Sequence, residues 1–434
     1  MNIRRELAKE NRSCIAALIL LCSIPLLPEY CAPLLTIGAL VCAVLDARRR
    51  GDILRVGTLG KLFLLYIAYM AIGILYSKHK LNSLSTVAMW IVAFCGYLTI
   101  TTVIFNRRRL HMFLVFFSLA AGLVGLIAGA QYLLRNLLHL SLPNQVWEPL
   151  DVVFYRYFPM TVDIHIAPER AAATFNNPNI MSEFLVMSLP LVAVCGFDGQ
   201  RTRVKLAARC CLLFVLVGVA ASFSRGAYLA LLSILLLILV TNLRKISPLM
   251  LSLVAAVSLI PEVIISRFFS IGIIHDFSIT QRFSTWDAAL QAILRSPLFG
   301  MGPGITNFSE FAKTFGLNVP HSHNILLQLL LEGGFVGLFL LSLVAIRLLQ
   351  NSAECLSRSP KTHLFGVFFL AFTVSFLVYG MVDFPFLCPK LMATFFTVMG
   401  TADAVFSLYL GQTSVSFSNL IPRFDIRQHR TALK

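Results

Sequence analysis

Apolar residues form long runs along the whole chain, separated mostly by short polar segments. Many runs approach about 18 residues, close to the length with which a helix crosses the ~30 Å hydrocarbon core of a bilayer. The predicted spans are residues 13–28, 30–46, 59–77, 85–105, 110–134, 179–197, 206–222, 226–242, 247–263, 322–346, 364–382 and 388–410. The pattern therefore predicts an all-α, polytopic integral membrane protein of about 12 helices, forming a single membrane domain over residues 1–434.

Composition supports this class. Of the 434 residues, 58% are hydrophobic and 13% charged, whereas soluble domains average about 25% charged residues. The N-terminal apolar run lacks a small-x-small cleavage site, so we expect it to stay as the first span rather than be removed as a signal peptide. No CxxC pair occurs among the ten cysteines, which indicates neither a zinc site nor a disulfide framework.

The net charge of +16 has the sign that nucleic-acid partners require, but its distribution argues against them. Most Lys and Arg residues fall in alternate connections, which predicts cytoplasmic N- and C-termini by the positive-inside rule. The basic segments would then contact anionic membrane lipids. Two connections on the opposite, outer face are long, residues 135–178 and 264–320, and we expect both to form outer loops with short interfacial helices.

The positive-inside rule does not explain three arginines that are predicted on the outer face. Arg225 lies at the tip of a predicted hairpin in "SFSRGAYLALL". It needs an anionic partner, which is either a substrate or the lipid head groups. Arg170 precedes "AAATFNNPN", whose asparagines are expected to cap the sixth span. Arg282 opens an amphipathic run that ends at the following Ser-Pro dipeptide and is predicted to lie along the membrane interface. The "LFGMGPG" segment after it reads as a loop, or as a source of N–H groups for an anion.

The segment "PHSHNILLQLLLEGG" places polar residues at the start of the tenth span. Asn324, Gln328 and Glu332 are four residues apart, so they share one face of a helix. On a straight helix Glu332 would lie ~13 Å below His323, and we interpret Gln328 and Glu332 as an interhelical hydrogen-bond stripe.

His323 differs from this stripe because it lies at the water boundary, where an imidazole can exchange a proton near neutral pH. His321 is expected to point elsewhere. A His-x-His pair can ligate a metal, but no outer acidic or cysteine cluster completes a set, so we expect none.

Arginines gathered on one face recognise multiply charged anions through bidentate hydrogen bonds. Together with a titratable histidine, they fit a site that holds a lipid-linked diphosphate and activates a hydroxyl nucleophile.

The segment "HSHNILLQLLLEGGFVGL", in which His323-Asn324 is followed after nine residues by Gly334, resembles the signature of the O-antigen ligase and polymerase superfamily. The blocks "ERAAATFNNPNIMSEFL", "FSRGAYLAL", "QRFSTWDAALQAILRSPLFGMGPG" and "VDFPFLCP" resemble its other recurrent blocks in the expected order. The resemblance covers roughly residues 167–400.

The resemblance implies a metal-independent, cofactor-free glycosyltransferase of the bacterial cytoplasmic (inner) membrane, with its active site facing outward. It would move a glycan from undecaprenyl diphosphate to an acceptor hydroxyl, with lipid A-core as the first choice. Carried over by position, His323 is the catalytic base, and Arg225 and Arg282 bind the diphosphate, with Arg170 as a further candidate. Candidates for supporting roles are His321, Asn324 and Asp383.

Other functions stay open. The same blocks are shared by surface-polysaccharide polymerases and protein O-oligosaccharyltransferases. A secondary transporter also has about twelve spans, but transporters show internal repeats and mid-membrane charges. Basic residues gathered at one interface favour the enzyme. The sugar, the stereochemistry and the roles of Glu332 and Asp383 are not readable from the sequence.

Overall fold

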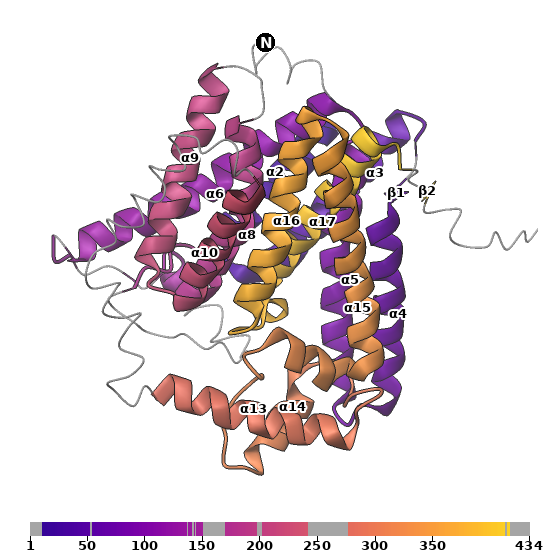
Figure 1. Cartoon of the computed structure of the whole chain (residues 1–434), viewed down its shortest axis with the longest axis vertical. Coiled ribbons are helices and arrows are strands. Elements are labelled where there is room, and N and C mark those ends of the chain that lie inside the picture. Colours follow the sequence, from indigo (N-terminus) through magenta and orange to yellow (C-terminus); the bar gives the residue numbers. More distant parts are fainter. Residues whose placement is uncertain are drawn as a thin grey trace, which may run out of the picture.

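The computed structural model describes residues 11–52, 54–136, 138–140, 143, 145–150, 170–197, 202–241, 277–412 and 415–416. Nine helical segments in this part are long and apolar enough to cross a membrane (Figure 1). They are Glu29–Arg49, which ends in α3 (Ala32–Arg49), α4 (Thr58–Tyr76), α5 (Lys80–Val103), α6 (Arg107–Asn136), α8 (Pro178–Phe197), α9 (Thr202–Ala221), α15 (Ile325–Arg358), α16 (Pro360–Gly380) and α17 (Pro389–Leu410). The predicted all-helical, polytopic membrane protein is confirmed.

Two predicted spans form shorter apolar helices. The first run gives α2 (Arg12–Ser23) and the 3-10 turn η1 (Ile24–Leu26), because Pro25 and Pro28 end the α-helix. The eighth gives α10 (Arg225–Thr241), with 17 residues. The span predicted at 247–263 lies outside the described residues.

The other elements are short apart from α13, which has 19 residues. They are η2 (Glu29–Cys31), α13 (Phe277–Arg295), α14 (Ile305–Lys313), η4 (Pro385–Leu387) and the antiparallel pair β1 (Arg55–Val56) and β2 (Val415–Ser416), in which Arg55 is opposite Ser416 and Val56 opposite Val415.

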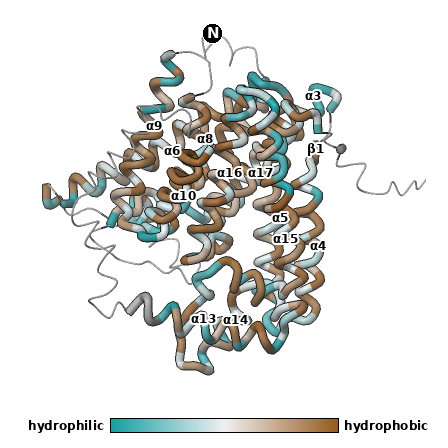
Figure 2. The backbone as a smooth tube through the Cα atoms, in the orientation of Figure 1, coloured by the Kyte–Doolittle hydropathy of each residue, from teal (hydrophilic) through white to brown (hydrophobic). Residues whose placement is uncertain are grey.

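An aromatic core joins α4, α5, α16 and α17. The Trp90 ring lies 4.8 Å from Phe386 and 5.8 Å from Phe396, and Phe63 lies 4.8 Å from Phe396. Edge-to-face and tilted rings of this kind add to the stability gained from burial alone. Figure 2 shows that the middle of the bundle is mostly hydrophobic and that polar segments collect towards its ends. The core therefore holds rigidly the helix ends from which the site is built.

α13 lies across the lower end of the bundle in Figure 1, together with α14. It ends at Arg295, where the Ser-Pro dipeptide predicted a stop. Ala288 and Ala292 are buried in a cluster with residues of α14 and α15, whereas Phe283 and Leu290 are exposed. Large apolar side chains of α13 such as Phe283 and Leu290 therefore point away from the bundle, and their contact with a membrane interface stays a prediction.

The span predicted over 322–346 is confirmed as α15, but it is not one unbroken helix. α15 begins at Ile325 and breaks at Gly334, whose φ of 60° and ψ of −165° are not helical. The N–H groups of Phe335 and Val336 donate to the carbonyls of Pro297 and Leu298, at 2.8 and 3.2 Å. A Cβ at position 334 would collide with the Leu298 carbonyl, so the break requires glycine. Glu332 lies before this break, in the first helical part of α15, so its expected depth in the membrane stays a prediction.

Candidate functional site

Asn324 fixes the start of α15 and ties it to the end of α16. Its Oδ1 accepts hydrogen bonds from the N–H groups of Leu326 and Leu327, at 3.0 and 3.1 Å, as an N-cap. Its Nδ2 donates to the Met381 carbonyl at 3.1 Å. Residues 321–323 are therefore held beside the loop that joins α16 to α17.

Ser322 is clamped between α13 and α15. Its N–H donates to Oε1 of Gln328, and its carbonyl accepts from Nε1 of Trp286, both at 3.0 Å. Gln328 in turn donates to Oε1 of Glu332 at 2.9 Å. Gln328 thus supports the histidine loop from within its own segment, whereas Glu332 also accepts a hydrogen bond from the backbone of Gly304 at the start of α14, as the predicted interhelical stripe requires.

His321, His323 and Asp383 form the centre of the site. Nδ1 of His323 lies 3.6 Å from Oδ1 of Asp383, just beyond hydrogen-bond distance. The two imidazole rings are 4.0 Å apart, and the His323 N–H donates to Nδ1 of His321 at 3.1 Å. The expectation that His321 points elsewhere is wrong. His323 has a φ of 51°, a region that favours glycine, and such strain clusters at functional sites.

Burial and charge separate the roles of these three groups. The His323 side chain is 30% exposed, whereas His321 is buried. Burial lowers the pKa of His321 to about 3, and the neighbouring His323 and Arg282 act in the same direction. Burial alone would raise the pKa of Asp383, but the two imidazoles, His323 foremost, lower it to about 2. At neutral pH the accessible His323 therefore lies between a neutral imidazole and a carboxylate.

The same three side chains could hold a metal ion, since one ligand atom from each lies within 4.8 Å of the others. The statement that no acidic residue completes a set with the two histidines is therefore wrong. The reason is that Asp383 lies 60 residues further along the chain and reaches the site through the α16–α17 loop. The absence of a metal requirement stays a prediction.

Arg282 and Arg170 approach the site differently. Arg282, half-buried on α13, is close enough to His321 for its charge to affect that imidazole. Arg170 donates from Nε to the Ser222 carbonyl at 2.7 Å and from Nη2 to Oδ1 of Asn179. These bonds hold the α9–α10 hairpin against the start of α8.

Arg225 is the first residue of α10, directly after this hairpin, and its side chain is half-buried. A Cβ on the next residue, Gly226, would lie 2.8 Å from Cγ2 of Val382, so α10 approaches the residue that precedes Asp383. Oγ of Ser224 is 3.2 Å from the Tyr379 hydroxyl. The fold thus brings the backbone of Arg225 close to the histidine and aspartate centre.

Residues 210–342 match the family model described as O-antigen ligase. This segment is therefore similar to an O-antigen ligase domain. The family resemblance seen in the sequence is confirmed for this segment, which contains Arg225, Arg282, His321 and His323 but neither Arg170 nor Asp383. None of the curated proteins compared with the chain matches it.

The family that this segment resembles comprises glycosyltransferases of the ligase or polymerase type, which act on lipid-linked glycans. The resemblance agrees with the nine helices in the described part of the chain that are long and apolar enough to cross a membrane.

Sequence analysis missed two further charged residues that lie near the site but outside the matched segment. Glu183 of α8 is buried, its Oε1 has no hydrogen-bond partner in the described part of the chain, and its charge interacts with that of Asp383. Nζ of Lys390, at the start of α17, donates to the Thr174 carbonyl at 2.6 Å. A charged residue inside an apolar run was the available signal for both.

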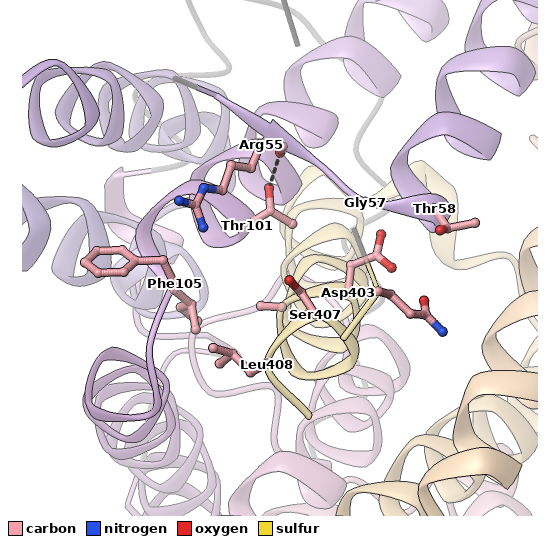
Figure 3. Close-up of a pocket in the computed structure, with 11 residues that line it drawn as sticks. Arg55, Gly57, Thr58, Thr101, Phe105, Asp403, Ser407 and Leu408 are labelled. Atoms are coloured by element: carbon pink, nitrogen blue, oxygen red, sulfur yellow. Dashed lines mark hydrogen bonds between the residues drawn. The ribbon is translucent and has the colours of Figure 1, made fainter. Parts of the chain in front are cut away.

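A small pocket at the opposite end of the bundle is not a second candidate for the functional site. Figure 3 shows it between Arg55, Thr101 and Asp403, with the hydrogen bond from Oγ1 of Thr101 to the Arg55 carbonyl at 2.7 Å. Its volume is about 30 Å³, which holds a water molecule or two at about 10–15 Å³ each. Oδ2 of Asp403 already accepts from the Tyr97 hydroxyl at 2.5 Å and from the Leu59 N–H at 2.9 Å. The Asp403 carboxylate therefore has a structural role.

Proposed function

We propose that the protein is an O-antigen ligase-type glycosyltransferase. It moves a glycan from undecaprenyl diphosphate to a hydroxyl of a lipid A-core acceptor, at the outer face of the bacterial cytoplasmic membrane and without a metal. The observation that carries the proposal is the accessible His323 beside Asp383, 3.6 Å apart, at the edge of the segment similar to an O-antigen ligase domain.

His323 acts as the general base. Because Asp383 lies beside Nδ1, the imidazole tautomer with its proton on Nδ1 is favoured, which leaves the lone pair of Nε2 for the acceptor hydroxyl. Asp383 also stabilises the imidazolium that forms when this proton is taken. The buried His321 holds the backbone N–H of His323 and keeps the ring in place.

The arginines stabilise the leaving group. As the acceptor oxygen bonds to the anomeric carbon, the bond from that carbon to the diphosphate oxygen breaks, and the departing diphosphate gains negative charge. The guanidinium groups of Arg225 and Arg282 bind it, because their planar donors match phosphate oxygens. Arg170 supports Arg225 through the hairpin carbonyl of Ser222.

The test is glycan transfer in vitro, in nanodiscs with EDTA, from an undecaprenyl-diphosphate oligosaccharide to lipid A-core. We expect transfer by wild type, and a loss of about a thousandfold in His323→Ala, within the range found for general bases. Transfer should also be almost completely lost in Arg225→Ala. The matched control is His363→Ala, because His363 lies at the far end of α16 and contacts the Leu356 carbonyl.

Retention of most activity by His323→Ala would overturn the base assignment. Transfer that stops in EDTA and returns with a divalent metal would overturn the metal-free mechanism. Absence of transfer from this donor to any hydroxyl acceptor would overturn the assignment of the protein as a glycosyltransferase.

A further inference from the structure

A buried tyrosine hydroxyl joins three elements at the site end of the bundle. Tyr379, in the last turn of α16, is 2% exposed. Its hydroxyl donates to the Asn179 carbonyl in α8 at 2.7 Å, which leaves its oxygen to accept from Oγ of Ser224, 3.2 Å away in the α9–α10 hairpin. Oγ of Ser182, also in α8, lies at 3.1 Å. Polar contacts of this kind stabilise the packing of helices in a membrane, so the hydroxyl ties α16 to both α8 and the hairpin.

The hairpin end of this network carries Arg225, which directly follows Ser224. Phe223, just before Ser224, has a φ of 49°, a conformation that a residue with a side chain adopts where its surroundings impose it. Gly226 lies against the tyrosine ring, since a Cβ there would be 3.6 Å from two ring carbons of Tyr379. The start of α10 is therefore placed by its contact with α16 as well as by the turn of the hairpin.

The α16 end of the network leads to the histidine and aspartate centre. Asp383 follows Tyr379 by four residues, and Met381 between them caps α16. The Met381 carbonyl accepts from Nδ2 of Asn324, the N-cap of α15 that directly follows His323. The tyrosine hydroxyl is thus a direct polar link between the arginine-bearing hairpin and the helix end to which the histidine loop is bound.

Given the transfer reaction proposed above, on which this inference rests, we propose that Tyr379 is a positioning residue for the donor diphosphate. Its hydroxyl holds Arg225 at the distance and orientation from His323 that donor binding requires. A guanidinium group binds phosphate oxygens through two parallel hydrogen bonds, so its orientation matters as much as its charge. Because Tyr379 is buried, it acts through Arg225 rather than by touching the substrate.

The test compares Tyr379→Phe with Tyr97→Phe as the matched control. Both substitutions keep a buried ring and remove one hydrogen-bonded hydroxyl. The Tyr97 hydroxyl lies at the β1–β2 end, where it donates to Oδ2 of Asp403 and accepts from two backbone N–H groups at the start of α4. Binding of radiolabelled undecaprenyl diphosphate to the full-length protein in nanodiscs is measured for each variant, alone and combined with Arg225→Ala. Thermal unfolding of the same preparations measures stability.

We expect Tyr379→Phe to weaken binding about threefold to tenfold, as for the loss of one hydrogen bond. Tyr97→Phe should leave binding unchanged, although both substitutions lower the unfolding midpoint. Combined with Arg225→Ala, Tyr379→Phe should weaken binding no further, because the hydroxyl acts through this arginine.

Three results of the binding experiment would overturn the inference. They are unchanged binding in Tyr379→Phe, an equal loss in Tyr97→Phe, and a full additional loss when Tyr379→Phe is combined with Arg225→Ala. The last two would show that the tyrosine only stabilises the fold. Absence of undecaprenyl-diphosphate binding by the wild type would overturn the proposed function and this inference together.

Kinetics separate the inference from the proposed function. In the transfer assay, the donor KM should rise in Tyr379→Phe while the acceptor KM stays unchanged. An equal rise in both KM values would contradict the inference even if transfer is confirmed. If the wild type binds the donor lipid but transfers nothing, the glycosyltransferase assignment fails, and the binding results still decide whether Tyr379 acts through Arg225.

Discussion

The two ends of the helical bundle both bury carboxylates, but they treat them differently. At the β1–β2 end, Asp46 is paired with Nη1 and Nη2 of Arg109, at 2.5 and 3.2 Å, and with Nε of Arg50 at 3.1 Å. Asp403 accepts from the Tyr97 hydroxyl and from two N–H groups at the start of α4. Both carboxylates therefore form their hydrogen bonds with other residues of the bundle.

At the site end, two acidic groups, Asp383 and Glu183, are left short of partners. Asp383 accepts the Phe384 N–H at 2.8 Å and faces His323 at 3.6 Å. Nδ1 of His323 and Oε1 of Glu183 are buried atoms without a hydrogen-bond partner in the described part of the chain. Buried polar groups are normally satisfied, so a group left short marks a place where function outweighs stability. The comparison separates scaffold from site for the carboxylates, although Nε of Arg347, near Asp403, is also a buried atom without a hydrogen-bond partner in the described part of the chain.

The largest expected effect is on activity. His323→Ala should reduce transfer about a thousandfold and leave the thermal unfolding midpoint almost unchanged, because the side chain is partly exposed and its Nδ1 makes no hydrogen bond. Both are measured on one preparation, by transfer assay and by thermal unfolding in detergent. A midpoint that falls in step with activity would show that His323 belongs to the scaffold.

The next effect is on stability. Asp403→Ala should lower the free energy of unfolding by about 3 kcal/mol, because it leaves the Tyr97 hydroxyl and the Leu59 and Gly60 N–H groups without their acceptor. Transfer per folded molecule should not change. Denaturant unfolding, together with activity normalised to folded protein, measures this, and Ser407→Ala at the same pocket is the control. If Asp403→Ala lost activity per folded molecule without being destabilised, the two ends of the bundle would not differ in the way described.

Asp383→Asn should give the reverse of Asp403→Ala. Transfer should fall about tenfold to a hundredfold, because His323 loses the group that orients it. Stability should fall by much less than in Asp403→Ala, although the lowered pKa of Asp383 means that the folded chain favours its carboxylate. The kinetic signature is a fall in kcat with little change in the donor KM. Clear destabilisation by this substitution would mean that Asp383 holds the α16–α17 loop.

The smallest effect is a pH dependence of stability. Because burial lowers the pKa of His321 to about 3 from its ordinary 6.5, the unfolded chain binds a proton that the folded chain refuses between these values. Stability is therefore complete above about pH 6.5 and falls below it, by at most about 1.4 kcal/mol per pH unit from this group. The pKa of Asp383, lowered to about 2, contributes only below about pH 3.8.

The measurement is the unfolding midpoint of wild type and His321→Gln between pH 7.0 and 5.0. We expect the wild type to lose more stability than the variant over this range. Equal slopes of the unfolding midpoint against pH in the two proteins would show that another group causes the pH dependence. They would contradict the assignment of a neutral, buried His321.

Sequence alone determined the membrane-spanning class, most helix positions and the family domain, because each depends on local properties. Apolar length predicts a span, a Ser-Pro dipeptide ends α13, and the spacing from His323-Asn324 to Gly334 is contained in one segment. Asn324 also begins its helix in the way its residue type favours.

Only the tertiary structure decided which polar groups meet. Asp383 reaches His323 across 60 residues of chain, and His321 turns towards the same centre because its partners come from other helices. The break at Gly334 exists because the loop after α13 inserts its carbonyls there, which no periodicity within α15 reveals. Side-chain convergence depends on how helices pack, and helix packing is a property of the whole bundle.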